Sequence, residues 1–143
     1  MAITQVSVTM ENKPGVLSSI SEMMGEAGAN LLALMVATAF GEGLLRFVTD
    51  NTEKAVEALK ANGYEPETSE VLACQTPHHP GGLNAILKPL KEADINVDHV
   101  YPCIGTAVGG QTVLILGVSS PAKARQVLKR NWIIMVDDEL YEI

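Results

Sequence analysis

Residues 12–17 read Asn12-Lys13-Pro14-Gly15-Val16-Leu17, and residues 78–83 read His78-His79-Pro80-Gly81-Gly82-Leu83. The two prolines stand 66 positions apart, and the same shift brings Ile20 onto Ile86, Ala27 onto Ala93 and Asn30 onto Asn96. Further along, a shift of 69 brings Ala55, Leu59, Lys60 and Asn62 onto Ala124, Leu128, Lys129 and Asn131. Ordered matches over a whole half-chain indicate that one module has been duplicated, with small insertions in its middle loop.

The first copy predicts the order strand, helix, strand, strand, helix, strand. Its first strand, residues 3–10, alternates between a buried face and a solvent face. The buried face carries Val6, Val8 and Met10, and the solvent face carries Gln5, Ser7 and Thr9. The helices are expected from Pro14 to Gly28 and, with Thr52 as cap, up to Asn62. The other strands are expected at residues 31–40 and 44–49, around a hairpin turn at 41–43, and from 64–67 onward.

The second copy predicts the same elements. They are strands at residues 71–75, 97–104, 112–118 and 133–136, helices at 81–93 and 121–131, and a hairpin loop at 105–110. Pro89 falls inside the first of these helices, where its missing N–H group should kink the helix or loosen one turn.

The fold class that follows is α+β. We expect two ferredoxin-like βαββαβ modules in tandem, at residues 1–68 and 69–143, each an antiparallel sheet with both helices on one face. One copy of about 70 residues buries only a small core, so pairing of two copies would by itself increase the stability of the fold.

The charge and composition exclude several classes of function. The formal net charge is −7, and residues 1–71 carry four basic and ten acidic side chains. A chain of this sign, without a basic stripe, is not expected to bind nucleic acid. The longest apolar stretch, residues 31–40, is far shorter than a membrane span, and the N-terminus lacks a signal peptide pattern. Two cysteines then favour free thiols in a reducing, cytoplasmic setting.

The two repeated segments resemble the ACT domain family. The resemblance rests on residues 11–17 followed by Gly28-Ala29-Asn30-Leu31, and on residues 79–83 followed by Ala93-Asp94-Ile95-Asn96-Val97. It covers nearly the whole chain, and the first copy is closest in style to the serine-sensing domain of phosphoglycerate dehydrogenase. The resemblance implies a stand-alone tandem ACT protein that binds an amino acid at an interface between domains, with the positions of Asn12 and Asn30 touching the ligand.

The physical chemistry of the first repeated loop fits such a site. A helix beginning near Gly15 offers the free N–H groups of Gly15, Val16 and Leu17 to a carboxylate. Asn30 lies at the far end of that helix, so it would serve the site of a neighbouring module. The candidate ligand-binding residues are Asn12, Pro14, Gly15, Val16, Leu17, Asn30, His78, Gly81, Gly82, Leu83 and Asn96. Two structural alternatives stay open: Asn12 as a helix cap and Asn30 as a left-handed turn residue.

Differences between this sequence and the serine-sensing domain limit the kinds of ligand that we expect the first loop to bind. Where that sensor carries a histidine, two positions before the asparagine, this chain has Met10, which favours a more apolar pocket than serine needs. In the second copy Asn12 becomes His78 and Met10 becomes Thr76. The two copies should therefore differ in affinity or ligand, and the second could have lost binding.

Other combinations of reactive residues are weaker. Cys74, His78, His79, His99 and Cys103 cluster in the sequence, but the expected topology separates them, so no metal is predicted. No serine or cysteine has the spacing of a catalytic triad or nucleophile elbow.

The sequence therefore predicts a non-catalytic regulatory protein without a cofactor. It would bind a small amino acid or related carboxylate and form a homo-oligomer, most simply a dimer, through exposed strand edges. The alternative is a dissociated regulatory subunit of an amino-acid biosynthetic enzyme, similar to the small subunit of acetolactate synthase. A small ferredoxin-like enzyme would need an acid–base or metal site that the sequence does not show.

Overall fold

The computed structural model describes residues 3–105 and 111–142. The chain divides into two compact units: the N-terminal unit comprises Thr4–Ser69, and the C-terminal unit begins at Glu70 and includes Ile3. The elements of the first half are β1 (Ile3–Glu11), α1 (Val16–Glu26), β2 (Leu31–Ala39), β3 (Glu42–Thr49), α2 (Thr52–Ala61) and β4 (Glu67–Thr76). Those of the second half are α3 (Asn84–Glu92), β5 (Val97–Pro102), β6 (Thr112–Val118), α4 (Pro121–Arg130), β7 (Met135–Val136) and a 3-10 helix, η2 (Asp138–Glu142).

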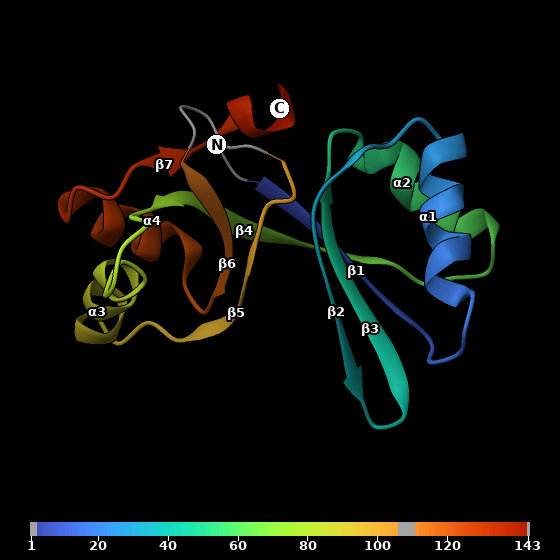
Figure 1. Cartoon of the computed structure of the whole chain (residues 1–143), viewed down its shortest axis with the longest axis horizontal. Helices are drawn as coiled ribbons and strands as arrows, with labels where there is room; N and C mark the ends of the chain where they lie inside the picture. The colour runs from blue at the N-terminus through green and yellow to red at the C-terminus, as the bar shows by residue number, and fades with distance from the viewer. Residues whose placement is uncertain (1–2, 106–110, 143) are drawn as a thin grey trace. The chain divides into compact units, whose positions relative to one another are not determined.

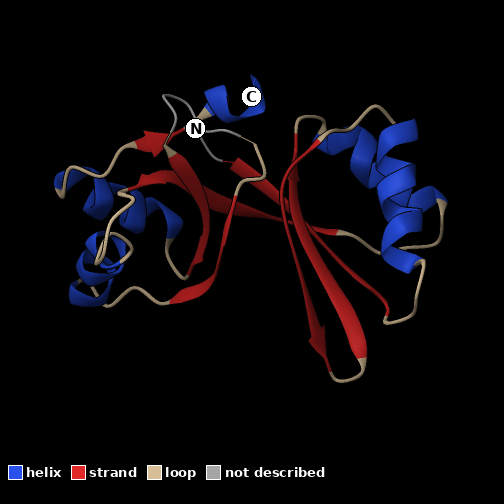
Figure 2. Cartoon of the chain, viewed as in Figure 1, coloured by secondary structure: helices blue, strands red, loops and turns tan. Residues whose placement is uncertain are grey.

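In the N-terminal unit, β3 lies between β1 and β2 and pairs antiparallel with both. This order makes β1 and β2 parallel to each other, on either side of β3. The turn from β2 to β3 uses Phe40 and Gly41, both with positive φ angles (53° and 80°), as a two-residue hairpin turn requires. Helices α1 and α2 contact each other and lie together on one side of the strands (Figures 1 and 2). The predicted ferredoxin-like arrangement is confirmed.

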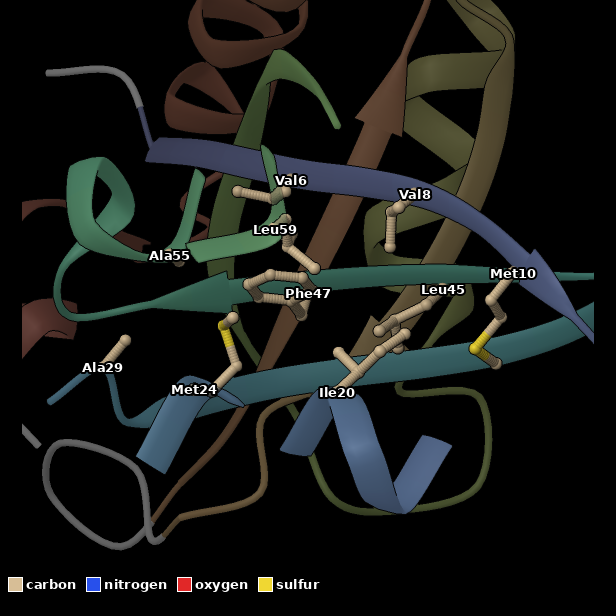
Figure 3. Close-up of a cluster of buried hydrophobic side chains, with 10 residues drawn as sticks. All are labelled: Val6, Val8, Met10, Ile20, Met24, Ala29, Leu45, Phe47, Ala55 and Leu59. Carbon is tan, nitrogen blue, oxygen red and sulfur yellow. The ribbon is translucent and has the colours of Figure 1, made fainter. Parts of the chain in front are cut away.

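The core of this unit fills the space between the sheet and its two helices (Figure 3). Its buried members are Val6, Val8, Met10, Ile20, Met24, Ala29, Leu45, Phe47, Ala55 and Leu59. The predicted apolar face of β1 is thus confirmed. The opposite face is not simply solvated, because Gln5 is only 1% exposed and its amide donates to Ser7 Oγ (3.4 Å) and Ser69 Oγ (3.3 Å). These hydroxyl partners offset the cost of burying an amide.

The C-terminal unit repeats this plan. Its β6 pairs antiparallel with β5 and with β4, and β7 pairs with the other edge of β4. Its core contains Leu72, Cys74, Ile86, Leu90, Ile95, Leu116, Val118, Ala124, Val127 and Leu128. The four core positions Ile86, Leu90, Ala124 and Leu128 match Ile20, Met24, Ala55 and Leu59 of the first copy at the two shifts read from the sequence.

The duplication extends to individual backbone hydrogen bonds. After α1, the N–H groups of Ala27, Gly28 and Ala29 bond the carbonyls of Met23, Gly25 and Met24. After α3, Ala93, Asp94 and Ile95 bond Pro89, Lys91 and Leu90, all 66 positions later. Gly28 and Asp94 both take left-handed φ angles, 74° and 57°. The two copies therefore share their turn geometry even where the residue has changed.

Several predicted boundaries are wrong at helix starts. Helix α1 begins at Val16, with Gly15 as N-cap, so Pro14 lies in the preceding turn. Asn51, not Thr52, caps α2, because its side chain accepts from the Lys54 N–H group. Helix α3 begins at Asn84 rather than at residue 81, since Gly81 has a φ of 83°. The helix continues through Pro89.

Strand predictions also needed correction. One strand, β4, replaces the two separate strands predicted at 64–67 and 71–75. Strands β5 and β7 are shorter than predicted. After β7 the chain forms the 3-10 helix η2, for which no element was predicted, and its Leu140 is fully buried. The predicted loop at 105–110 lies, apart from Gly105, outside the described residues.

Trp132 gives a test of the shared turn geometry. It is 92% exposed and has a φ of 65°, where the first copy has Gly63 with a φ of 85°. A non-glycine residue with a left-handed φ angle costs roughly 1–2 kcal/mol. Glycine avoids this strain, but it loses more conformational entropy on folding, and that loss offsets part of the gain. We therefore expect Trp132→Gly to raise the free energy of unfolding by about 0.5–1 kcal/mol, measured by urea denaturation. Gly63→Ala is the matched control and should lower it; a loss of stability in Trp132→Gly would contradict the argument.

Candidate functional site

The loop between β1 and α1 leaves Asn12 available for another partner. Gly15 is the N-cap of α1 with a φ of 91°, and no side chain caps this helix. The alternative role of Asn12 as a helix cap is therefore wrong. Asn12 is exposed on the turn that leads into the helix.

The N-terminus of α1 offers free donors, but not the same three that the sequence predicts. The Val16 N–H group donates to the Lys13 carbonyl at 3.3 Å, and Ser19 donates to the Gly15 carbonyl at 2.9 Å. The N–H groups of Gly15, Leu17 and Ser18 have no hydrogen-bond acceptor within the described part of the chain. These three donors, at the positive end of the helix dipole, remain for an anionic group.

Opposite charges flank Asn12. Lys13 Nζ lies 2.8 Å from Glu11 Oε2, and both side chains are about 70% exposed. The hydrogen bond from Lys13 lowers the pKa of the Glu11 carboxyl, and the same contact raises the pKa of Lys13. An ion pair this exposed adds little to stability. Its consequence is chemical: the loop presents a carboxylate and an ammonium beside an uncommitted amide.

Asn30 lies at the other end of α1. Its backbone N–H donates to Asp50 Oδ1 at 2.8 Å, and its carbonyl accepts from the Asp50 N–H at 3.2 Å. Asn30 is not among the described residues with positive φ, so its alternative role as a left-handed turn residue is wrong. The 11 residues of α1 place roughly 16 Å between its two ends. Asn12 and Asn30 are therefore not brought together within one unit.

The corresponding loop of the second copy, between β4 and α3, is more tightly folded. Gly82 donates its N–H to the His79 carbonyl at 2.9 Å, and a Cβ atom at Gly82 would lie 2.1 Å from the Pro77 carbonyl oxygen. Only glycine fits such an approach of backbone to backbone. His79 Nδ1 lies 2.9 Å from the Pro80 carbonyl oxygen, to which it can donate.

A cavity of about 400 Å³ opens against this second loop. It is lined by Thr76, Pro77, His78, His79, Leu83, Val100, Tyr101, Pro102 and Leu114. Its volume lies within the range of small-molecule sites. Of the residues predicted for the second copy, His78 and Leu83 line the cavity, whereas Gly81, Gly82 and Asn96 do not. The lining from β5 and β6 was not predicted.

Asn96 is held by its own neighbours. Its Nδ2 donates to Asp98 Oδ1 at 2.7 Å, and its backbone N–H donates to Ser119 Oγ at 3.1 Å. Asp50 and Ser119 occupy matching positions, so both copies fix the start of this strand in the same way. The two asparagines differ in their side chains, because that of Asn30 has no hydrogen-bond partner among the residues described.

The cysteines and histidines do not gather around a metal ion. No group of three His, Cys, Asp or Glu side chains within residues 3–105 and 111–142 could hold one. Burial raises the pKa of Cys74 to about 12 and that of Cys103 to about 11, so both thiols are protonated at neutral pH. A thiolate is the form that ligates metals and attacks substrates. His99 instead packs its ring over Gly117 and stacks with Tyr101.

The helices that the structure describes include none with the length and apolar character needed to cross a membrane.

Comparisons with solved structures support the architecture. The chain is 27% identical to protein BT0572 from Bacteroides thetaiotaomicron, with a TM-score of 0.89 over 100% of this chain and 98% of that one. It also shares its fold with the regulatory subunits of aspartate kinase from Thermus thermophilus (13% identity, TM-score 0.66, 91% of this chain and 93% of that one) and from Thermus flavus (12%, 0.65, 92% and 94%). No curated protein matches the chain.

A family model confirms the resemblance read from the two loops. The model described as an ACT domain pair matches residues 1–143. The match covers both copies of the duplicated module, as the repeated loops and repeated hydrogen bonds require. The chain therefore belongs to the family of ACT domain pairs.

Proposed function

We propose that this ACT domain pair is a non-catalytic regulatory protein whose N-terminal unit binds a small amino acid at the loop of residues 11–17. The observation that carries the proposal is the set of groups in this loop. Glu11 and Asn12 suit an α-ammonium, while Lys13 and the free N–H groups of Leu17 and Ser18 suit an α-carboxylate. Both charged ends of a zwitterion thus have a candidate partner among residues 11–18.

A second ACT module would complete this site. Asn12 and Asn30 lie at opposite ends of α1, so one ligand could touch both positions only if two modules contributed one each. Binding would then favour the assembled state over the separate one, which is a direct route from ligand to regulation. We propose a homo-oligomer, most simply a dimer, as the form that binds.

A thermal-shift screen tests this proposal. The wild-type chain is first screened against the twenty standard amino acids, and Asn12→Ala is then measured with any amino acid that binds. A ligand present at 100 times its Kd adds about 2.7 kcal/mol to the free energy of unfolding, so a binding amino acid raises the Tm. Losing a hydrogen bond to a charged ligand costs about 1.5–3 kcal/mol. We therefore expect Asn12→Ala to weaken binding roughly 10- to 100-fold.

Asn62→Ala is the matched control for this screen. Asn62 donates to the Ala58 carbonyl at the end of α2, so its loss should lower the Tm of the free chain but leave the ligand-induced shift unchanged. If no amino acid shifts the wild-type Tm, or if Asn12→Ala keeps the full shift, the proposal is wrong.

A second arrangement is a dissociated regulatory subunit of an amino-acid biosynthetic enzyme. Its support is the length of the structural match: this chain covers 93% of the regulatory subunit of aspartate kinase from Thermus thermophilus. In that case the ligand would act through a large catalytic partner. Affinity purification of the tagged chain should then recover a stoichiometric enzyme, whereas a stand-alone sensor would be recovered only with copies of itself.

A further inference from the structure

We infer that the cavity of the C-terminal unit takes an apolar carboxylic acid that lacks an α-ammonium group, such as a branched or aromatic α-keto acid. This inference rests on the proposed function, because it assigns the ligand of the second copy of the same loop. It gives the two copies different ligands: a zwitterionic amino acid at residues 11–17 and a simple anion at residues 76–83.

The apolar lining of the cavity favours a ligand with an apolar side chain. Leu83, at the start of α3, is 45% exposed, and Val100, on β5, is 38% exposed. Both line the cavity, together with Pro102 and Leu114. Large apolar side chains left half in solvent around one hollow gain by being covered, and the volume of about 400 Å³ accommodates a branched or aromatic side chain.

The polar side chains of the cavity can all donate hydrogen bonds, and none of them is a carboxylate. His78 and His79 lie on its loop side, and His78 has no hydrogen-bond partner within the described residues. An imidazole carries an N–H group in either tautomer, so His78 can donate to a carboxylate. None of the nine lining residues is acidic.

The first copy shows what the second has lost. At a shift of 66, Glu11, Asn12 and Lys13 become Pro77, His78 and His79. The carboxylate and the amide oxygen that could accept from an α-ammonium are replaced by a proline and an imidazole. Removing an ammonium from water without a charged partner is costly, so the second loop should bind an amino acid more weakly than the keto acid with the same side chain.

The test compares acids that share a side chain. Isothermal titration of the full wild-type chain with L-leucine, L-phenylalanine and their α-keto acid analogues measures each affinity. We expect the keto acids to bind at least tenfold more tightly than amino acids at the His78 site. His78→Ala should weaken keto acid binding at least tenfold, and Leu83→Asp should abolish it through charge repulsion. Both residues are exposed, so these variants should fold.

Asn12→Ala separates this inference from the proposed function. It should leave keto acid binding unchanged while it weakens amino acid binding roughly 10- to 100-fold. If amino acid binding depends on Asn12 but no keto acid binds, the inference fails and the proposed function stands. If a keto acid binds through His78 while no amino acid binds, the inference stands and the proposed function fails. Keto acid binding that survives both His78→Ala and Leu83→Asp would overturn the site assigned here.

Discussion

Phe47→Ala is expected to lower the free energy of unfolding by about 3–5 kcal/mol. Phe47 is fully buried on β3, where it lies opposite Val6 of β1 and Leu34 of β2. Figure 3 shows its ring at the centre of the cluster, between the strands and the helices α1 and α2. The whole stability of a small domain is about 5–15 kcal/mol, so a loss of this size removes a large fraction of the stability of the N-terminal unit.

The duplication supplies the control for Phe47. The matching position of the C-terminal unit is Leu116, which is also fully buried. Phe47→Leu keeps most of the apolar volume, so it should cost only about 1–2 kcal/mol. Urea denaturation followed by circular dichroism measures both changes. If Phe47→Ala and Phe47→Leu shift the midpoint equally little, Phe47 is not central to this core.

Gly82→Ala is expected to lower the free energy of unfolding by about 3 kcal/mol. The added Cβ would lie 2.1 Å from the Pro77 carbonyl oxygen and 3.0 Å from that of His79. Both are backbone atoms, so relief requires the loop itself to move. Because Pro77 and His79 line the cavity, the same substitution should also remove any ligand bound there.

Gly25→Ala is the matched control for Gly82. Gly25 lies within α1, and a Cβ there would meet nothing within 4 Å. Alanine in a helix interior is favoured over glycine by about 0.8–1 kcal/mol, so this variant should be more stable than the wild type. Equal effects of the two substitutions in urea denaturation would show that the loop at Gly82 tolerates a side chain.

The sequence predicts the fold well because a duplication repeats every signal. The matched positions Ile20 and Ile86, or Leu59 and Leu128, each identify a core position twice, and all four are buried. Helix starts were less predictable, since they depend on single φ angles. Gly81 delays α3 by taking a left-handed angle, which its sequence position alone does not require. The burial of Gln5 depends on Ser69, a partner 64 residues away.

The sequence predicted only those residues of the candidate site that lie within the repeated loop. His78 and Leu83 belong to the repeated loop, and the structure places both at the cavity. Val100, Tyr101 and Pro102 come from β5, which reaches the loop only through the folding of the sheet. The choice between the roles of Asn12 also needed geometry, because a cap and a free ligand group have the same sequence. The observed N-cap at Gly15 excludes the cap role and leaves the ligand role as a proposal.

The most direct test of the central claim, that this chain is an amino-acid sensor, is ligand-observed NMR. Saturation-transfer difference spectra would be recorded on a mixture of the twenty standard amino acids with the full wild-type chain, and then with Asn12→Ala. The account predicts transfer to at least one amino acid in the wild type and a much weaker transfer to it in the variant. Absence of transfer to every amino acid in the wild type, or equal transfer in both proteins, would contradict it.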